Sequence, residues 1–506
     1  MRIKTISVAI LAGIAVTACN SHEDMTVSEG VVLRNASIVN TTDGSVSTGR
    51  NIIVNAGRIT AITGDRVNVT GTAQSVDASG KFVVPGFNDM HSHAMGDADE
   101  VPAPWPLFIA NGITGLRQMS GDAATIAKAR QLNLDSAAHK LEAPEILLVP
   151  SDIFTGLQGT TAAAGAAFVD KNVADGADFV KVVGGNRDAV LGVLAQAKAK
   201  GRHVAGHMVP ALATTDAVQA GWFAIEHLGG NFGFMLDCSS ASSPIRQSLL
   251  ASPPFQPPVS SPAAAVTYLL NPRAFDGTAL APTFQKILDT YDEAACKSLV
   301  NQFSSARTWH VPTLIRLRTQ SFGNDPAYMQ NPDLQYTDKT TRALYQQTGQ
   351  LFAAQGPAVV ATMEAFYGLE EKLVKMLDDS NVPMLAGTDS GNQVHGFSLH
   401  DEFRLLAKAG LSPLRILQMT TLNGARFLGR ESSMGSVEVG KDANLVVLDA
   451  NPIADVANLS KISSVVLKGR VFSSAELATM KAEVAAAYAA QAPKAAADLI
   501  DTGHRH

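Results

Sequence analysis

Two histidines separated by a single residue, His91 and His93, end the run Phe87-Asn88-Asp89-Met90-His91-Ser92-His93, which is expected to be a strand. Side chains alternate along a strand, so both imidazoles point to the same side of the chain. Neutral imidazoles placed together are ligands that suit Zn²⁺. Two surface histidines give the same pattern, so a metal site needs support from other parts of the chain.

A lysine interrupts the apolar run from Phe179 to Val183. Phe179, Lys181 and Val183 share one face of the expected strand, and an unpaired lysine is almost never fully buried. A neighbouring carboxylate would pair with Lys181. Alternatively, reaction with CO₂ converts the amine into a carbamate, an anion whose two oxygens can bridge two metal ions. That reaction requires a neutral amine, which nearby metal ions favour.

Three further histidines and one aspartate stand near the ends of apolar runs. His203 and His207 lie on one face of the expected strand 203–208, but only His207 is near its C-terminal end. We therefore expect His207 to be the ligand and His203 to be packed at the opposite end. His227 ends another run, before two glycines. Asp389 follows the run from Pro383, where a lone aspartate would otherwise be read as a helix cap or a turn residue.

Alternating strands and helices must position these residues. Apolar strands are expected at 114–120, 145–153, 179–185, 203–208, 222–228, 309–315 and 383–389. With the strand that enters His91 they make eight, and most are separated by helical stretches such as 187–200 and 211–220. This pattern predicts an α/β fold, a (β/α)8 TIM-type barrel, whose active site lies at the C-terminal ends of the strands.

The flanks of the barrel have a different character. Short apolar strands with turn signals occupy 31–84 and recur in 426–474, which predicts one small β-sandwich domain built from both segments. The hydrolase barrel then spans 85–425. A proline- and serine-rich stretch at about 231–280 does not fit the repeat and is expected to be an insertion. Residues 475–506 are expected to form a surface helix and a tail.

The first residues resemble a bacterial lipoprotein signal. Arg2 and Lys4 precede an apolar stretch that is too short for a standard membrane-spanning helix. The stretch ends in a lipobox-like run before Cys19. We expect residues 1–18 to be cleaved, Cys19 to carry the lipid and 19–30 to form a tether. Asn20 after the cysteine favours the outer membrane, so the expected location is the bacterial cell envelope, on the periplasmic face.

Composition excludes some classes of protein. The 506 residues are 46% hydrophobic and 17% charged, which is typical of a globular chain. A formal net charge of −6 without a basic stripe argues against a nucleic-acid partner. Cys238 and Cys296 flank the proline-rich stretch. Export makes a disulfide between them possible, but the sequence leaves their pairing and any homo-oligomer open.

In their order and local sequence, these residues resemble the amidohydrolase superfamily, in particular its imidazolonepropionase-like and metal-dependent prolidase branch. The resemblance covers about 31–472, including the run from Val84 to His93 and the run from Gly435 to Leu448. It implies that His91, His93 and Asp389 bind one divalent ion. It also implies that His207 and His227 bind a second ion and that a carbamate on Lys181 bridges the two.

The resemblance further implies two zinc ions and a bridging hydroxide as nucleophile, with Asp389 as the catalytic proton carrier. A small molecule or dipeptide with a C-terminal amino acid is the expected substrate. Four side chains after the strands are candidates to hold its carboxylate: Arg117, Arg187, Arg316 and His395.

Other functions remain alternatives. One is an ester, lactone or phosphotriester hydrolase, because an activated hydroxide attacks any polarised centre. Another is a mononuclear deaminase or imidazolonepropionase-like enzyme. Deaminases of this superfamily place a glutamate near the fifth-strand histidine, whereas Met208 to Ala211 follow His207 here. A non-catalytic binder is the third, although such proteins normally lose one of the six metal-binding residues.

Overall fold

The computed structural model describes residues 25–251, 261–389 and 394–495. Cys19 and the expected signal peptide lie outside the described residues. Within the described ranges, no helix combines the length and the apolar character needed to cross a membrane.

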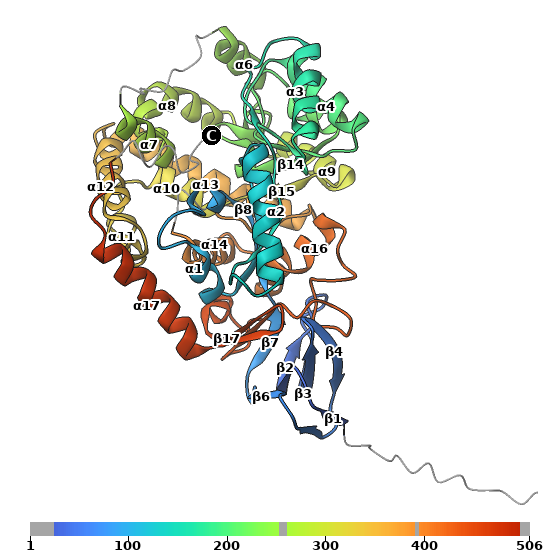
Figure 1. Cartoon of the computed structure of the whole chain (residues 1–506). Helices are drawn as coiled ribbons and strands as arrows, with labels where there is room; N and C mark the ends of the chain where they lie inside the picture. Colours follow the sequence, from blue (N-terminus) through green and yellow to red (C-terminus); the bar gives the residue numbers. More distant parts are fainter. Residues whose placement is uncertain (1–24, 252–260, 390–393, 496–506) are drawn as a thin grey trace, which may run out of the picture.

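Strands from both ends of the chain form one eight-stranded sheet, at the bottom of Figure 1. Its order is β18-β17-β16-β7-β2-β3-β4, and β6 pairs with β2. The N-terminal strands are β2 (Val31–Val39), β3 (Val46–Asn55), β4 (Arg58–Thr63), β6 (Gln74–Asp77) and β7 (Phe82–Pro85). The C-terminal strands are β16 (Leu445–Leu448), β17 (Ile462–Leu467) and β18 (Arg470–Ser473).

The second layer of the expected sandwich is small. It consists of β1 (Met25–Val27) and β5 (Val67–Val69), which pair in parallel. Val27 and Val67 pack against Val32 and Ile53 of the large sheet. The expected tether 19–30 is therefore too long, because the chain is already part of a sheet at Met25.

Parallel strands form two further sheets that carry the site. One has the order β10-β9-β8, from β8 (Phe87–Ser92), β9 (Ile113–Gln118) and β10 (Glu145–Leu148). The other runs in chain order through β11 (Ile153–Phe154), β12 (Val180–Val182), β13 (Val204–Gly206), β14 (Trp222–Glu226) and β15 (Trp309–Val311). The expected strand 145–153 is thus split in two.

The segment 383–389 was expected to be a full strand but makes only an isolated parallel bridge, between Met384 and His310. Backbone hydrogen bonds still tie it to a strand on each side. Leu385 N donates to His310 O at 2.9 Å, and Met90 N donates to Ala386 O at 2.9 Å. The segment therefore lies between β15 and β8, although these contacts do not by themselves confirm one closed barrel.

Helices surround these strands (Figure 1). The helices of the first five β–α repeats and the one before β15 are α1 (Trp105–Ala110), α2 (Ala123–Ala137), α3 (Ala162–Ala174), α4 (Arg187–Ala199), α5 (Thr214–Gln219) and α9 (Glu293–Ala306). Those that follow 383–389 are α14 (Phe397–Lys408), α15 (Pro413–Thr420) and α16 (Leu422–Leu428). Short 3-10 helices are η1 (Ala94–Asp97), η2 (His227–Gly229), η3 (Gly233–Leu236), η4 (Pro332–Tyr336) and η5 (Val456–Ser460).

Two helical excursions interrupt the repeat. After β14 the chain forms α6 (Ser242–Ala251), α7 (Pro262–Leu270) and α8 (Arg273–Asp289), so this excursion extends beyond the expected limit of 280. After β15 it forms α10 (Leu314–Ser321), α11 (Pro326–Met329), α12 (Lys339–Ala353) and α13 (Pro357–Asp379). The expected strand 309–315 is too long, because Thr313 takes a left-handed conformation (φ 46°) and α10 begins at Leu314.

The C-terminal helix α17 (Ser474–Ala490) packs against other elements along one of its faces. Its N-terminus is closed by a capping box between Ser473 and Glu476. Leu477 packs with Ile109 and Phe472, and Val484 packs with Leu107. These contacts bury one face of α17 against α1 and the β domain.

Candidate metal centre

His91 lies at the C-terminal end of β8 and His93 directly after it, and both side chains are buried. The neighbouring segment approaches His91 very closely. A Cβ atom built on Gly387 would lie 2.8 Å from the His91 backbone N and 2.7 Å from Val311 Cγ1. Only glycine fits there, and this close approach brings Asp389 beside the two histidines.

Asp389 occupies the middle of the cluster. One carboxylate oxygen lies 3.0 Å from His93 Nε2 and 3.4 Å from His91 Nε2. The other lies 3.9 Å from His227 Nε2. Burial opposes ionisation of Asp389, but the hydrogen bond with His93 and the neighbouring His91 hold its pKa well below the usual range. The carboxylate is thus available as an anionic ligand.

Lys181, on β12, points into the same interior and is 1% exposed. Its Nζ lies 3.5 Å from His91 Nε2. Burial lowers the pKa of Lys181 to about 8, although the carboxylates of Glu226 and Asp389 oppose the change. The structure places Lys181 in the interior beside His91, as the sequence predicts.

His227 and His207 complete the cluster. The ring of His227 lies 4.4 Å from that of His91 and 5.2 Å from that of His207, measured between centroids. Burial lowers the pKa of His207 to about 3, so its imidazole is neutral, as a metal ligand must be. His203 lies outside the cluster, as expected, and its ring stacks on that of Phe223 with the centroids 3.6 Å apart, but the residue is exposed rather than packed in the interior.

Three of the imidazoles are held by other side chains through Nδ1, the ring nitrogen that does not face Asp389. Glu226 accepts from His91 Nδ1 at 2.7 Å, and Ser120 Oγ pairs with His93 Nδ1 at 2.8 Å. The hydroxyl of Thr313 pairs with His227 Nδ1. These contacts fix each ring so that its Nε2 faces Asp389, which is the usual outer support of metal-binding histidines.

The sequence analysis missed these supporting residues. Glu226 directly precedes His227, so alternation alone places the two side chains on opposite faces of β14 and gives no sign that both serve one site. Asp89 was also missed. Its carboxylate accepts from Thr388 Oγ1 at 2.6 Å and from Thr388 N at 3.0 Å, which fixes the chain next to Asp389. Burial raises the pKa of Asp89 to about 7.

The backbone at the cluster is strained. His227, Thr313 and Asp389 all have positive φ values, of 53°, 46° and 62°. Residues with side chains adopt this left-handed region rarely, and such strain concentrates at functional sites. The sharp turns aim these side chains back over the ends of the strands.

A cavity of about 350 Å³ opens beside the cluster, lined in part by His207, His227 and Asp389. Of the four residues expected to hold a substrate carboxylate, only Arg316 lines it. Its Nε lies 3.1 Å from Asp389 Oδ2.

The expectation for Arg117 was wrong. Its side chain is 0% exposed, donates to Glu226 Oε1 at 2.6 Å and to Met90 O, and packs beside Phe179 and Phe427. The strand turns it into the interior, where it supports His91 through Glu226. Arg187 and His395 do not line the cavity. They pair with Asp216 and Asp97 at 3.4 and 2.7 Å.

The donor set fits a metal ion. Among the described residues, ligand atoms of His91, His227 and Asp389 lie within 4.8 Å of one another, and all three side chains are buried. Neutral nitrogens and one carboxylate oxygen are the ligands that Zn²⁺ takes. Three donors from three separate segments of the chain, each fixed by a second contact, form a built site rather than a chance cluster.

Comparisons with known proteins find similarity to amidohydrolases. Residues 370–472 match the model of the amidohydrolase family. A 5'-deoxyadenosine deaminase of Methanobrevibacter smithii is 36% identical over 87 residues, which are 15% of this chain and 20% of the deaminase. The chain thus matches only about a fifth of that relative's length.

Two solved structures share the fold over most of the chain. A Xaa-Pro dipeptidase with bound methionine aligns with a TM-score of 0.58 and 18% identity, over 88% of this chain and 100% of that one. A bottromycin amidohydrolase aligns with a TM-score of 0.62 and 18% identity, over 92% and 93%. The chain therefore has the α/β fold of these two structures, and its residues 370–472 are similar to the amidohydrolase family. Together these findings support an enzyme that acts on C–N bonds, as the sequence predicts.

Proposed function

We propose that this protein is a metal-dependent hydrolase that cleaves an amide bond. The observation that carries the proposal is the convergence of His91, His227 and Asp389 beside the cavity, with Lys181 buried against them. In this assignment His91, His93 and Asp389 would hold one divalent ion, and His207 and His227 would hold a second. Lys181, as a carbamate, would supply a further anionic ligand, and zinc is the expected metal.

Metal ions bound there would polarise the substrate carbonyl and make water a stronger nucleophile near neutral pH. The protein's own residues transfer the proton and orient the metal-binding imidazoles. Asp389 accepts the proton of the attacking water and delivers it to the leaving nitrogen. Glu226, Ser120 and Thr313 keep three imidazoles oriented toward Asp389.

For the fold we propose a closed eight-stranded barrel. The parallel strands fit it, with the segment 383–389 between β15 and β8 as the eighth member.

For the leaving group we propose a C-terminal amino acid. An exported enzyme meets peptides, and the Xaa-Pro dipeptidase shares this fold. Arg316 is the guanidinium group of the cavity lining that lies beside Asp389, so a free carboxylate would approach it. The test compares an N-acyl amino acid with its C-terminal amide. Carboxylate recognition predicts at least a tenfold lower kcat/KM for the amide, or about 1.4 kcal/mol. Equal rates would exclude it.

Deamination is the second candidate, since the match to a 5'-deoxyadenosine deaminase favours it. Release of ammonia from 5'-deoxyadenosine, with no cleavage of acyl amino acids, would establish that function instead. A lactone, ester or phosphotriester substrate is tested in the same panel. Turnover of lactones alone would replace the amide proposal.

We also propose that the mature protein is anchored to a bacterial membrane by lipid on Cys19, which lies outside the described residues. The lipobox-like run supports the proposal. Expressed in a bacterium, wild type should partition with membranes, and C19S should not be processed by the lipoprotein route. Recovery of unmodified wild type in the soluble periplasm would contradict the proposal.

A further inference from the structure

One wall of the cavity beside the metal centre is formed by the excursion after β14. Phe232 and Leu236 contribute from the start of the excursion, and Tyr268, Leu269 and Pro272 contribute from the end of α7 and the turn after it. All five present mainly carbon atoms. In Figure 1, α6, α7 and α8 lie together at the end of the molecule opposite the β domain.

A second part of the lining is apolar as well. Met208 and Leu212 follow β13, and Leu317 lies on α10. All three are nearly buried and line this cavity. Together with the excursion wall, these apolar side chains form a subsite that disfavours charge on the substrate.

The charged groups of the lining already have protein partners. Arg246 forms an ion pair with Asp237 and donates to the carbonyls of Pro210 and Leu212. The second carboxylate oxygen of Asp237 accepts from Thr214 N at 2.8 Å. A paired arginine and aspartate cancel each other, so this rim offers little to a charged substrate group.

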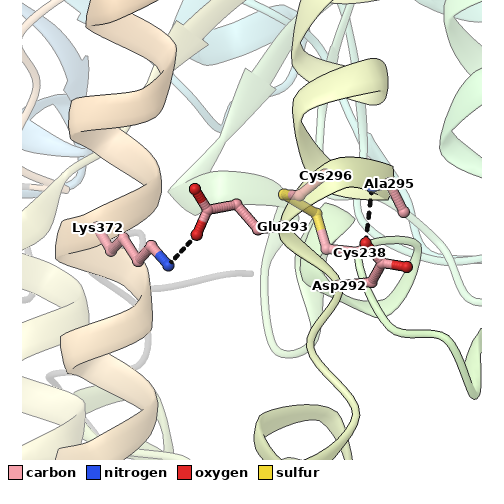
Figure 2. The surroundings of a disulfide bond; sticks show 6 residues. All are labelled: Cys238, Asp292, Glu293, Ala295, Cys296 and Lys372. Carbon is pink, nitrogen blue, oxygen red and sulfur yellow. Dashed lines mark hydrogen bonds and ion pairs between the residues drawn. A yellow bond between two sulfur atoms is a disulfide. The ribbon is translucent and has the colours of Figure 1, made fainter.

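The excursion wall is fixed in place. Arg316 donates to Leu269 O at 2.6 Å and to Leu270 O at 2.5 Å, which closes the C-terminal end of α7. At the start of the excursion, a disulfide joins Cys238 to Cys296 of α9 (Figure 2). Cys238 directly follows the lining residues Leu236 and Asp237, so both ends of the wall are held. A pocket held in this way loses little entropy when a ligand enters.

We propose that this pocket binds a bulky, uncharged, apolar group next to the scissile bond and so selects the substrate. The inference rests on the proposed amide hydrolysis and adds the class of group that the enzyme prefers. Cavities of this size and character typically hold small organic groups. A butyl, hexyl or phenyl group would contact both apolar parts of the lining, whereas an acetyl or glycyl group would leave them in water.

The test is a homologous series of N-acyl amino acids, from acetyl to octanoyl, with a parallel series that varies the amino acid from glycine to phenylalanine. In one of the two series, kcat/KM should rise with apolar size, by up to about fourfold for each buried methylene. The responding series identifies which side of the bond occupies the pocket. A flat response in both series would overturn the proposal.

A matched pair of variants links the effect to the wall. L269N places an amide on the lining and should flatten the size dependence. L250N makes the same change on α6 at a side chain that is 57% exposed and lies outside the cavity, and should leave the dependence intact. Thermal unfolding checks that both variants fold. If L269N does not fold, Y268W narrows the cavity and should shorten the longest chain accepted.

A binding measurement separates this proposal from the proposed function. Calorimetric titration with uncharged alkanamides, from acetamide to octanamide, requires no turnover. Dissociation constants that tighten with chain length in wild type but not in L269N support the pocket even if no amide is cleaved. Dissociation constants independent of chain length would overturn the pocket and leave the hydrolase proposal untouched.

Discussion

Arg316 connects the metal centre to the excursion wall through one guanidinium group. Its Nε lies 3.1 Å from Asp389 Oδ2, while its two terminal nitrogens donate to Leu269 O and Leu270 O. The side chain is nearly buried. The planar guanidinium can make both contacts at once, whereas a lysine ammonium offers no such fixed geometry. We infer that Arg316 is a positioning residue that holds both the carboxylate and α7.

Removal of this arginine should lower kcat more than it changes KM. In R316M, Asp389 loses a charged partner, and charge-assisted hydrogen bonds contribute about 1.5–3 kcal/mol, so kcat should fall by about 10- to 100-fold. R316K should retain part of the rate. R318M on the same helix removes a guanidinium that pairs with Asp325 away from the cavity and is the control. An R316M variant that loses thermal stability but keeps kcat would restrict Arg316 to a structural role.

Metal content should depend on the cluster and not on histidines in general. We expect about two divalent ions per chain in protein purified without chelator, because the resemblance supplies a complete set of six ligands. H227N should lower both metal content and rate. H203N should change neither, because His203 stacks on Phe223 away from the cluster. Elemental analysis measures the outcome, and a stoichiometry that stays at one under metal supplementation favours a mononuclear enzyme.

Lys181 should carry a carbamate in metal-loaded protein. The reason is its burial beside His91, where an unpaired ammonium would be expensive to desolvate. Protein prepared with ¹³C-labelled bicarbonate should show a carbamate carbon signal that is absent from K181M. An unmodified amine in metal-loaded crystals would remove the bridge from the mechanism. K181M should also lose one of the two ions.

The sequence was sufficient to place His91 and His93 side by side because the alternation of side chains along one strand is a local property. Alternation along β8 places His91 and His93 together, and an apolar strand around Lys181 turns that side chain inward. The three supports of the imidazoles could not be read in this way. Glu226, Ser120 and Thr313 meet their histidines across strands that are far apart in the sequence, and no local period encodes these pairs.

The substrate contacts were the weakest part of the sequence analysis. Arg117 was counted among the side chains after the strands, although the expected strand 114–120 already contains it, and β9 buries it against Glu226. The excursion after β14 was found from its prolines, yet its helices and its role as a cavity wall were not. That role depends on how α7 returns to Arg316, and this contact spans 46 residues of sequence.

The disulfide should contribute to stability. It closes a loop of 58 residues, and the loss of chain entropy in the unfolded state corresponds to about 4 kcal/mol. C238A/C296A should therefore unfold at a lower denaturant concentration than wild type. The double variant avoids a free thiol, and wild type in reducing buffer should show a similar loss. Equal midpoints would indicate that the bond does not form in the protein as made.

The final prediction concerns pH. Glu402, on α14, is fully buried and accepts from Ile315 N at 2.7 Å. Burial raises the pKa of Glu402 to about 8, above the ordinary value of 4.5, although hydrogen bonds from Ile315 and Leu314 oppose the change. The folded state therefore keeps a proton that the unfolded state releases between these two pH values.

It follows that the free energy of unfolding should fall as pH rises from about 5 to 8, by at most about 1.4 kcal/mol per pH unit from this one group. E402Q mimics the protonated side chain and should flatten that part of the profile, so that it is more stable than wild type at pH 8 and similar at pH 5. E483Q changes an exposed glutamate on α17 and should follow wild type. Denaturant titrations at pH 5, 6.5 and 8 measure the difference. Parallel profiles for E402Q and wild type would show that Glu402 is ionised in the folded protein, with charge that the interior stabilises.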